Sequence, residues 1–141
     1  MKKLVVLFLG ILMVVSLAGC GGGGSTPGVL TVYFHFQDSS NNNAPIVGVK
    51  LGYTDPSGTQ ATSSATGDNG EFSVVLTKAG TYIINTVYYN GQTYNLADYD
   101  ATFTVNVEQG DIDGNKRIKE TIPIDMSTNP PSIGEPIEVT L

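Results

Sequence analysis

The sequence of 141 residues has one cysteine, Cys20, and one histidine, His35. A single cysteine excludes an internal disulfide, and His35 has no second histidine or other cysteine with which to complete a metal site or a nucleophile–base pair. Basic residues are also scarce, with seven Lys and Arg against thirteen Asp and Glu and a net charge of −6. This charge repels nucleic acid and anionic lipid headgroups, so we expect no nucleic-acid partner.

A long apolar run and the Ala, Leu, Glu and Lys periodicity of helices are missing as well. Residues 4–15 form the main apolar stretch, which is shorter than the roughly 20 residues that a transmembrane helix needs. Lys2 and Lys3 precede this stretch, and Ser16 ends it. A basic start followed by a short apolar region is typical of a secretory signal peptide. We therefore assign residues 1–19 to such a segment rather than to a membrane span.

The end of this segment, Leu17-Ala18-Gly19-Cys20, resembles the lipobox of bacterial lipoproteins. The resemblance implies that the thiol of Cys20 receives a diacylglyceryl group and that the peptide bond before it is cut. Two or more acyl chains anchor a protein stably, because each buried methylene contributes about 0.8 kcal/mol. Gly21, in place of Asp, does not signal inner-membrane retention in Gram-negative lipoproteins. We expect a lipid-anchored protein of the bacterial cell envelope, at the outer membrane if the cell is Gram-negative and otherwise on the outer face of the cell membrane.

Residues 20–28 contain the lipidated cysteine and a Gly/Ser-rich tract, which predicts a flexible linker. Residues 29–141 are enough for one domain and too few for two. Short runs of alternating apolar and polar residues follow one another in this part, separated by turn sequences. Such a pattern predicts an all-β fold, an antiparallel β-sandwich of about seven to nine strands, with no helix after the signal.

The alternation also predicts which side chains share a face. In the first strand His35 lies opposite the large apolar residues, and over 81–89 the alternation groups Tyr82 and Ile84 with Thr86 and Tyr88. Turn sequences separate the strands at 55–58, 68–70 and 90–91, where Asn-Gly is typical of a type I′ hairpin. The predicted strands cover 30–37, 47–53, 60–66, 72–76, 81–89, 92–96, 101–107, 118–124 and 137–141.

Three segments, 44–51, 66–72 and 79–84, carry a family resemblance. They resemble the prealbumin-like carboxypeptidase regulatory-like modules and are similar to the invasin-type bacterial Ig-like repeats. Both groups share a "Pro, apolar, Gly, Val" strand, a "Thr, Asp, Gly, Phe" hairpin and a "Gly, Thr, Tyr" strand entry. The resemblance spans roughly residues 30–107 and leaves the choice between the two groups open. It implies a sandwich with a spacer, adhesion or accessory binding role and without catalytic residues.

An acidic segment is the candidate metal site. Asp111, Asp113 and Asn115 bring oxygen atoms to positions one, three and five of an EF-hand-like loop, which makes them a weak Ca²⁺ candidate. Lys116 stands where that loop needs glycine, and Ile122 where it needs a bidentate glutamate. A solvated turn between two strands is therefore the favoured interpretation.

Tyrosines cluster around the Asn-Gly hairpin, at positions 88, 89, 94 and 99. Tyrosine gives a large contact area at modest entropic cost and is common in binding surfaces. Alternation turns about half of them toward the core. We expect Tyr89 and Tyr94 to be exposed, and Tyr89, Tyr94 and Tyr99 to form a binding surface for a glycan or a protein.

Asp98 and Asp100 flank Tyr99 and are the remaining candidates for chemistry. Paired carboxylates divide the acid and base roles of glycoside hydrolysis only across a cleft at a defined separation. Two residues apart, they more often keep a strand edge soluble. We therefore expect no catalytic residues and no enzyme.

Together these features predict a lipid-anchored, non-enzymatic β-sandwich that acts as a structural or protein-binding accessory module. It needs no cofactor besides the covalent lipid on Cys20. Its partners would be the membrane, through that lipid, and an envelope protein or a glycan. A carbohydrate- or Ca²⁺-dependent adhesion module is the alternative, and a small envelope hydrolase is the third hypothesis.

Overall fold

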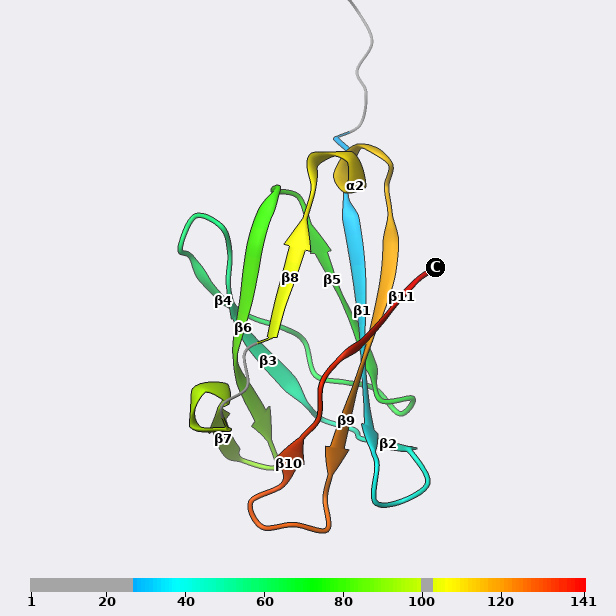
Figure 1. Cartoon of the computed structure of the whole chain (residues 1–141), viewed down its shortest axis with the longest axis vertical. Helices are drawn as coiled ribbons and strands as arrows, with labels where there is room; N and C mark the ends of the chain where they lie inside the picture. Colours follow the sequence, from blue (N-terminus) through cyan, green and yellow to red (C-terminus); the bar gives the residue numbers. More distant parts are fainter. Residues whose placement is uncertain (1–26, 100–102) are drawn as a thin grey trace, which may run out of the picture.

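The computed structural model describes residues 27–99 and 103–141, which form two facing β-sheets (Figure 1). The predicted all-β sandwich is confirmed. The predicted signal peptide, Cys20 and most of the linker lie outside the described residues, as do Asp100 and Ala101. No helix within the described ranges is long and apolar enough to cross a membrane.

The first sheet is built around β1 (Leu30–Asp38), which buries alternate side chains as its sequence predicts. On one side β1 pairs with β5 (Glu71–Leu76), and on the other with β9 (Arg117–Asp125). His35 lies on the outer face, opposite the buried phenylalanines, as expected. Three short strands complete the sheet, namely β2 (Ala44–Pro45) beside β1, and β10 (Ser132–Ile133) and β11 (Ile137–Thr140) beside β9.

The pairing of β1 with β9 is parallel, an exception within the predicted antiparallel sandwich. The other pairs described are antiparallel. Parallel neighbours need a long connection, and all five strands of the second sheet lie between these two strands in the sequence. Alternation shows which side of a strand is buried but not which neighbour the strand will pair with, so the sequence pattern could not reveal this pair.

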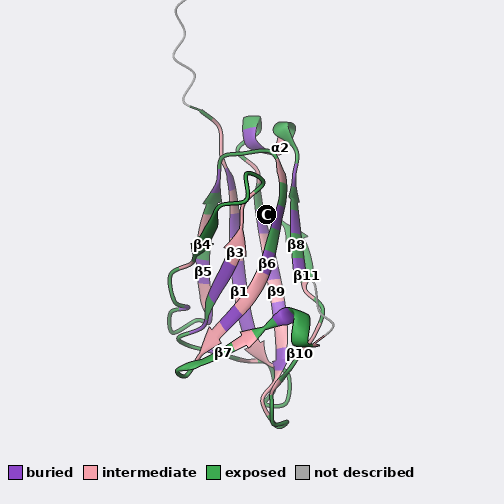
Figure 2. Cartoon of the chain, turned by 90° about the vertical axis from the view of Figure 1, so that its left-hand side faces the viewer, coloured by how far each residue is buried: buried purple, intermediate pink, exposed green. Residues whose placement is uncertain are grey.

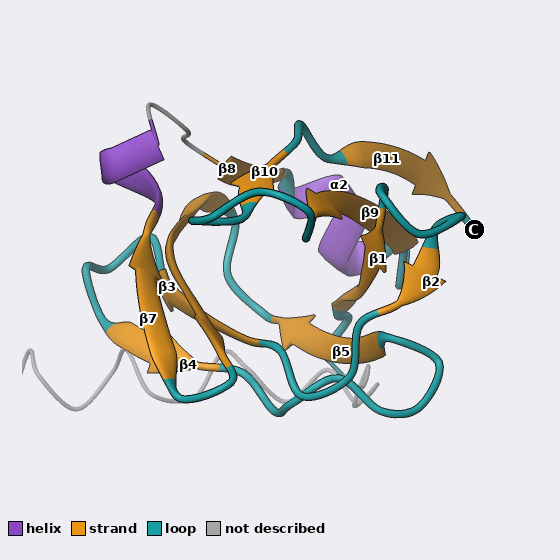
Figure 3. Cartoon of the chain, turned by 90° about the horizontal axis from the view of Figure 1, so that it is seen from below, coloured by secondary structure: helices purple, strands orange, loops and turns teal. Residues whose placement is uncertain are grey.

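The second sheet is built around the long strand β6 (Gly80–Tyr89). One side of β6 pairs with β3 (Lys50–Thr54), which in turn pairs with β4 (Gln60–Thr62) at the edge. The other side pairs with β8 (Phe103–Val107) along the first half of β6 and with β7 (Gln92–Asn95) along the second half. Seen from below, the two sheets form opposite sides of the molecule (Figure 3).

The core lies between the sheets and is formed by buried residues of both, which alternate with more exposed residues along the strands (purple in Figure 2). Phe34 and Phe36 stack on Phe72, with ring centroids 5.4 and 6.2 Å apart. Leu51 and Val87 contribute from the second sheet and are almost fully buried. Burying apolar area stabilises the fold by about 25 cal/mol per Å², so this layer holds the two sheets together. It also determines which side chains of each strand point outward.

The turns at 55–58 and 90–91 form where the sequence predicts them. The amide of Gly58 donates to the carbonyl of Asp55 at 2.9 Å, which closes the predicted turn at 55–58. Asn90 and Gly91 both have positive φ, 49° and 75°, as a type I′ hairpin requires. Gly70 also has positive φ, and a Cβ there would lie 2.6 Å from the carbonyl oxygen of Phe36. This close approach explains the glycine.

One buried threonine joins the segments before β3 and after β4. Thr66 is 3 % exposed, and its hydroxyl donates to the carbonyl of Ile46 at 2.7 Å and accepts from the amide of Val49 at 3.0 Å. Residues 63–66 continue along the start of β3 through such bonds instead of forming a regular ladder. For this reason the strand predicted over 60–66 ends at Thr62.

A β-bulge interrupts β6. Gly52 of β3 pairs with Thr86 and Tyr53 pairs with Ile84, so Asn85 is an extra residue. A bulge reverses the alternation beyond it. Val87 therefore points into the core, and the prediction that Thr86 and Tyr88 share the face of Tyr82 and Ile84 is wrong.

Two short helices correct the expectation of no helix after the signal. The 3-10 helix η1 (Leu96–Tyr99) follows β7 and buries Leu96, so the strand predicted over 92–96 ends at Asn95. The α-helix α2 (Gln109–Asp113) buries Ile112 and begins with a reciprocal capping box between Glu108 and Asp111. Each apolar residue anchors a single turn to the core, and one turn is too short to show a helical period in the sequence.

Candidate functional site

The outer face of the second sheet carries a hollow of about 620 Å³, lined by residues 52–53, 60–62, 85–86, 88, 95 and 97–98. We call this hollow the outer groove. It crosses β4, β3, β6 and β7, the strands that face the viewer in Figure 2. Its volume lies within the range of small-molecule sites, about 300–1,000 Å³.

Gly52 forms the floor of the outer groove. It is buried in the middle of β3, and a Cβ at this position would lie 3.2 Å from the Cβ of Thr86 and 3.4 Å from Cε2 of Tyr88. A larger residue would therefore fill the hollow. Glycine in a strand interior often marks a close backbone approach or a bulge, and here the bulge at Asn85 lies directly opposite.

That bulge gives the groove its polar side chains. Because Asn85 is an extra residue, Asn85 and Thr86 both line the outer groove, and Tyr88 follows them on the same face. The amide of Asn85 donates to the hydroxyl of Thr54 at 3.0 Å and accepts from the hydroxyl of Thr86 at 3.2 Å. These bonds fix Asn85 at the edge of the groove.

Cross-strand pairing arranges the rest of the groove as a row. Thr62, Gly52, Thr86 and Asn95 are successive partners across β4, β3, β6 and β7. The helix η1 stands beside β7 and supplies Asp98 to the lining. The row thus offers hydroxyl and amide groups on both sides of a floor that has no side chain.

The chemistry of the groove suits an uncharged polar ligand. Among the described residues, its lining contains one carboxylate, that of Asp98, and no Lys, Arg or His. Hydroxyl and amide groups can each donate and accept hydrogen bonds. Tyr88 adds an aromatic ring, which combines apolar contact area with a polar end.

The predicted tyrosine surface divides between the two sides of the sheet. Tyr89 and Tyr94, expected to be exposed, are half-buried and pack against the core, because the bulge turns Val87 and its partner Tyr94 inward. Tyr99 is also half-buried, with its ring 6.4 Å from that of Tyr94, and burial raises the pKa of Tyr99.

Sequence reasoning missed Tyr88 as a groove residue. The available signal was the pair of polar residues, Asn85 and Thr86, between the apolar Ile84 and Val87. Two polar residues in a row break a period of two, and a bulge is the simplest way in which a paired strand absorbs one extra residue.

The acidic segment predicted to bind Ca²⁺ forms the helix α2 and the turn that follows it, and its side-chain oxygens already have partners. Asp111 accepts from the amide of Glu108 and pairs with Lys116 at 3.0 Å, and the hydrogen bond from Lys116 lowers the pKa of Asp111. Asp113 accepts from Gln109 at 2.8 Å, and the side-chain oxygen of Asn115 accepts from the amide of Val29 at 3.1 Å. No group of three or more acidic, His or Cys side chains within the described ranges is placed to hold a metal.

The aspartates beside Tyr99 are placed only in part. Asp98 lies in η1 and lines the outer groove, whereas Asp100 lies outside the described residues. The described residues therefore give no carboxylate separation that would support the hydrolase hypothesis.

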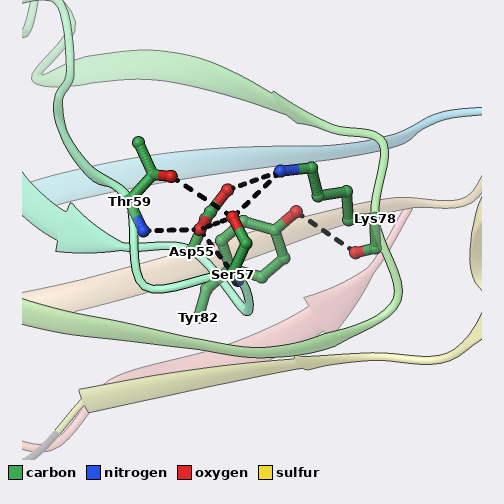
Figure 4. Close-up of polar contacts among 5 residues, drawn as sticks. All are labelled: Asp55, Ser57, Thr59, Lys78 and Tyr82. Atoms are coloured by element: carbon green, nitrogen blue, oxygen red, sulfur yellow. Dashed lines mark hydrogen bonds and ion pairs between the residues drawn. The ribbon is translucent and has the colours of Figure 1, made fainter.

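A second polar cluster closes the end of the sandwich near the turn at 55–58 (Figure 4). Asp55 accepts from the amides of Ser57 and Thr59 at 2.9 and 2.8 Å and pairs with Lys78 at 2.8 Å. The hydroxyl of Tyr82 donates to the carbonyl of Lys78 at 3.1 Å. The bond from Lys78 is the main reason that the pKa of Asp55 lies well below its ordinary value. Every contact in this cluster fixes a turn, so it is a structural clamp.

A buried carboxylate lies on the inner face of the first sheet. Glu120 is 7 % exposed, and its β9 position pairs with Glu138 of β11. Burial, and next the negative charge of Glu138, raise the pKa of Glu120 to about 7. Glu120 therefore binds a proton near neutral pH and titrates in the physiological range.

Comparisons with known protein families and with curated proteins find no match to this chain.

Proposed function

We propose that the chain is a lipid-anchored, non-enzymatic module of a bacterial cell envelope, acting as a structural or protein-binding accessory. The proposal is supported by the order of its parts: a signal segment, Cys20 in a lipobox-like sequence, a Gly/Ser-rich linker and one folded sandwich. The lipid would hold the chain at the membrane, and the linker would let the sandwich reach a partner.

The observation that carries the binding role is the outer groove. Most ionic groups that the structure describes hold turns or strands in place, as Asp55, Lys78 and Asp111 do. The outer groove instead collects polar side chains around a hollow. Such an arrangement supports binding rather than chemistry, because it offers hydrogen-bonding groups without a nucleophile–base pair.

The pairing of strands also supports one of the two family resemblances. In the immunoglobulin arrangement the first strand lies beside the second in one sheet. Here β1 pairs with β5 and β9, whereas the next long strand, β3, belongs to the other sheet. We therefore propose the prealbumin-like group, within a sandwich that is Ig-like only in the broad sense of two facing sheets.

Adhesion to carbohydrate is the second candidate function, and the composition of the outer groove favours it. The Ca²⁺-dependent version has no such support, because the oxygens of Asp111, Asp113 and Asn115 already accept hydrogen bonds or pair with Lys116.

A crosslinking pull-down tests the accessory role. The tagged full-length chain would be crosslinked in membranes, solubilised in detergent and purified, with Cys20→Ala as the unanchored control. We expect one stoichiometric protein partner with the wild type that is lost with Cys20→Ala. Equal recovery of that partner with both chains would contradict a role that depends on the anchor.

A further inference from the structure

We propose that the outer groove binds a neutral saccharide chain. This inference rests on the binding role proposed above and names its ligand, but it does not depend on the lipid anchor. It starts from the shape of the site: a floor without a side chain at Gly52, flanked by Thr86 and Tyr88, whose nearest carbons would lie 3.2 and 3.4 Å from a Cβ at this position.

The polar groups around this floor match a ligand rich in hydroxyl groups. Thr62 and Asn95 stand at opposite ends of the cross-strand row, both are exposed, and neither side chain has a hydrogen-bond partner among the described residues. A sugar hydroxyl both donates and accepts, as do the threonine hydroxyl and the asparagine amide. Four strands at about 4.8 Å spacing give the row a width of roughly 14 Å, room for a short oligosaccharide.

Tyr88 supplies the apolar contact that a sugar ring needs. Its ring borders the floor of the groove, with Cε2 near the space above Gly52, and it is half-buried. A tyrosine held by its surroundings offers a rigid face at low entropic cost on binding. The ring can therefore pack against the carbon-rich face of a sugar while the amides and hydroxyls bind its edges.

The charge of the site selects a neutral ligand. Among the described residues, the lining has one carboxylate, that of Asp98, and no basic residue, while the exposed Lys50 lies just outside it as the cross-strand partner of Tyr88. The chain as a whole carries a net charge of −6, and this excess of negative charge disfavours phosphate, sulfate and uronate groups.

The test is a calorimetric titration of the full chain purified from membranes in a zwitterionic detergent, since a maltoside detergent would itself present sugar. The probes are maltotetraose, cellotetraose and N-acetylchitotetraose as neutral chains, and tetragalacturonate as the anionic chain. We expect at least one neutral chain to bind with a Kd of millimolar or tighter, and the anionic chain to bind more weakly.

Two groove variants and two matched controls locate the site. Tyr88→Ala should weaken binding at least tenfold and Asn95→Ala about fivefold, the factor for one hydrogen bond. Tyr33→Ala, on the outer face of the first sheet, and Asn106→Ala, on β8 away from the groove, should leave the Kd unchanged. Asn95 is exposed, so its variant keeps the test valid even where Tyr88→Ala lowers the Tm.

Three results would overturn the proposal: no binding of any neutral chain up to about 10 mM, ten times a weak millimolar Kd; tighter binding of the anionic chain; or equal losses in the controls. The outcome is separable from the accessory role. Capture of an anchor-dependent protein without saccharide binding would overturn the groove proposal alone, and saccharide binding without a captured protein would overturn the accessory role alone.

Discussion

The two outer faces of the sandwich arise from the same alternation and yet differ in chemistry. On the first sheet, Lys119 pairs with Glu71, and Arg117 donates to the Tyr33 hydroxyl at 2.6 Å while its guanidinium lies over the ring of Tyr33. Each of these three charged groups is thus engaged by a partner on the same face. On the second sheet, a bulge and a glycine create a hollow whose lining carries no basic residue.

The difference shows how little is needed to turn a sheet face into a site. Both faces have polar residues at alternate positions, as any half-buried sheet does. What distinguishes the second is one inserted residue, Asn85, and one missing side chain, at Gly52.

We expect the largest effect at Glu120, the buried carboxylate of the first sheet. Its pKa is about 7 in the folded state and 4.5 unfolded, so the folded chain binds more protons between these values and stability falls as pH rises from 4.5 to 7. Glu120→Gln should remove this loss and raise the free energy of unfolding at pH 8 by on the order of 2 kcal/mol.

Urea unfolding of both chains at pH 5 and pH 8 measures the effect. His35, whose pKa is lowered chiefly by burial and then by the charge of Lys119, titrates in both chains, so their difference isolates Glu120. Glu135→Gln, at an exposed acid, is the control. A Glu120→Gln chain less stable than wild type at pH 8 would show that the charged carboxylate is stabilised by its surroundings.

Filling the outer groove tests the second sheet. Gly52→Val should cost about 1–3 kcal/mol, the range for overpacking, because the new Cβ lies 3.2 Å from that of Thr86. Gly67→Val is the matched control, since a Cβ there has its nearest contact at 3.7 Å. Thermal unfolding would compare the two. Equal Tm values for both variants would mean that the floor of the groove is less confined than described.

A smaller effect is expected from the ion pair on the first sheet. A double-mutant cycle of Lys119→Ala and Glu71→Ala should give a coupling free energy of about 0.2–1 kcal/mol. This coupling should decrease with added salt, because exposed charges are screened. The same cycle on Thr62 and Asn95 should give none, since no contact joins them. Coupling in the second pair but not the first would reverse the contrast between the faces.

The smallest change is expected at the clamp of Figure 4. The pKa of Asp55 is lowered on folding, mainly by the bond from Lys78, so its contribution is present above the unfolded pKa of 3.8 and lost as pH falls below it. Asp55→Asn should lower the Tm slightly at pH 7, and the gap to wild type should narrow as the pH falls from 4 toward 2. Because the folded-state pKa lies well below 3.8, part of the gap should remain at pH 2. A gap that is the same at pH 5 and pH 2 would indicate a contribution unrelated to charge.

Much of the fold could be predicted from the sequence because turns and alternation are local. Asn90-Gly91 and the sequence 55–58 fixed their turns through residue chemistry, and β1 buried the residues that its pattern assigned. The parallel pairing of β1 with β9 could not be predicted in this way, since it depends on contacts between distant segments.

The outer groove was harder to predict for a similar reason. A period of two carried through Asn85 groups Tyr88 with Tyr82 and Ile84, and Gly52 lies opposite Thr86 only after the strands pair. The tyrosines cluster around the predicted hairpin, but the sequence does not show from which side of the sheet each ring projects. A site formed by residues on four strands exists only once their register is set.

Chemical-shift mapping by heteronuclear NMR tests the contrast most directly. The full chain in zwitterionic micelles would be titrated with the neutral tetrasaccharides, and amide signals of both outer faces followed. We predict that the signals of Gly52, Thr86, Tyr88 and Asn95 shift, whereas those of Tyr33, His35 and Lys119 do not. Changes centred on the first sheet, or none on either face, would contradict the assignment of the second sheet as the binding face.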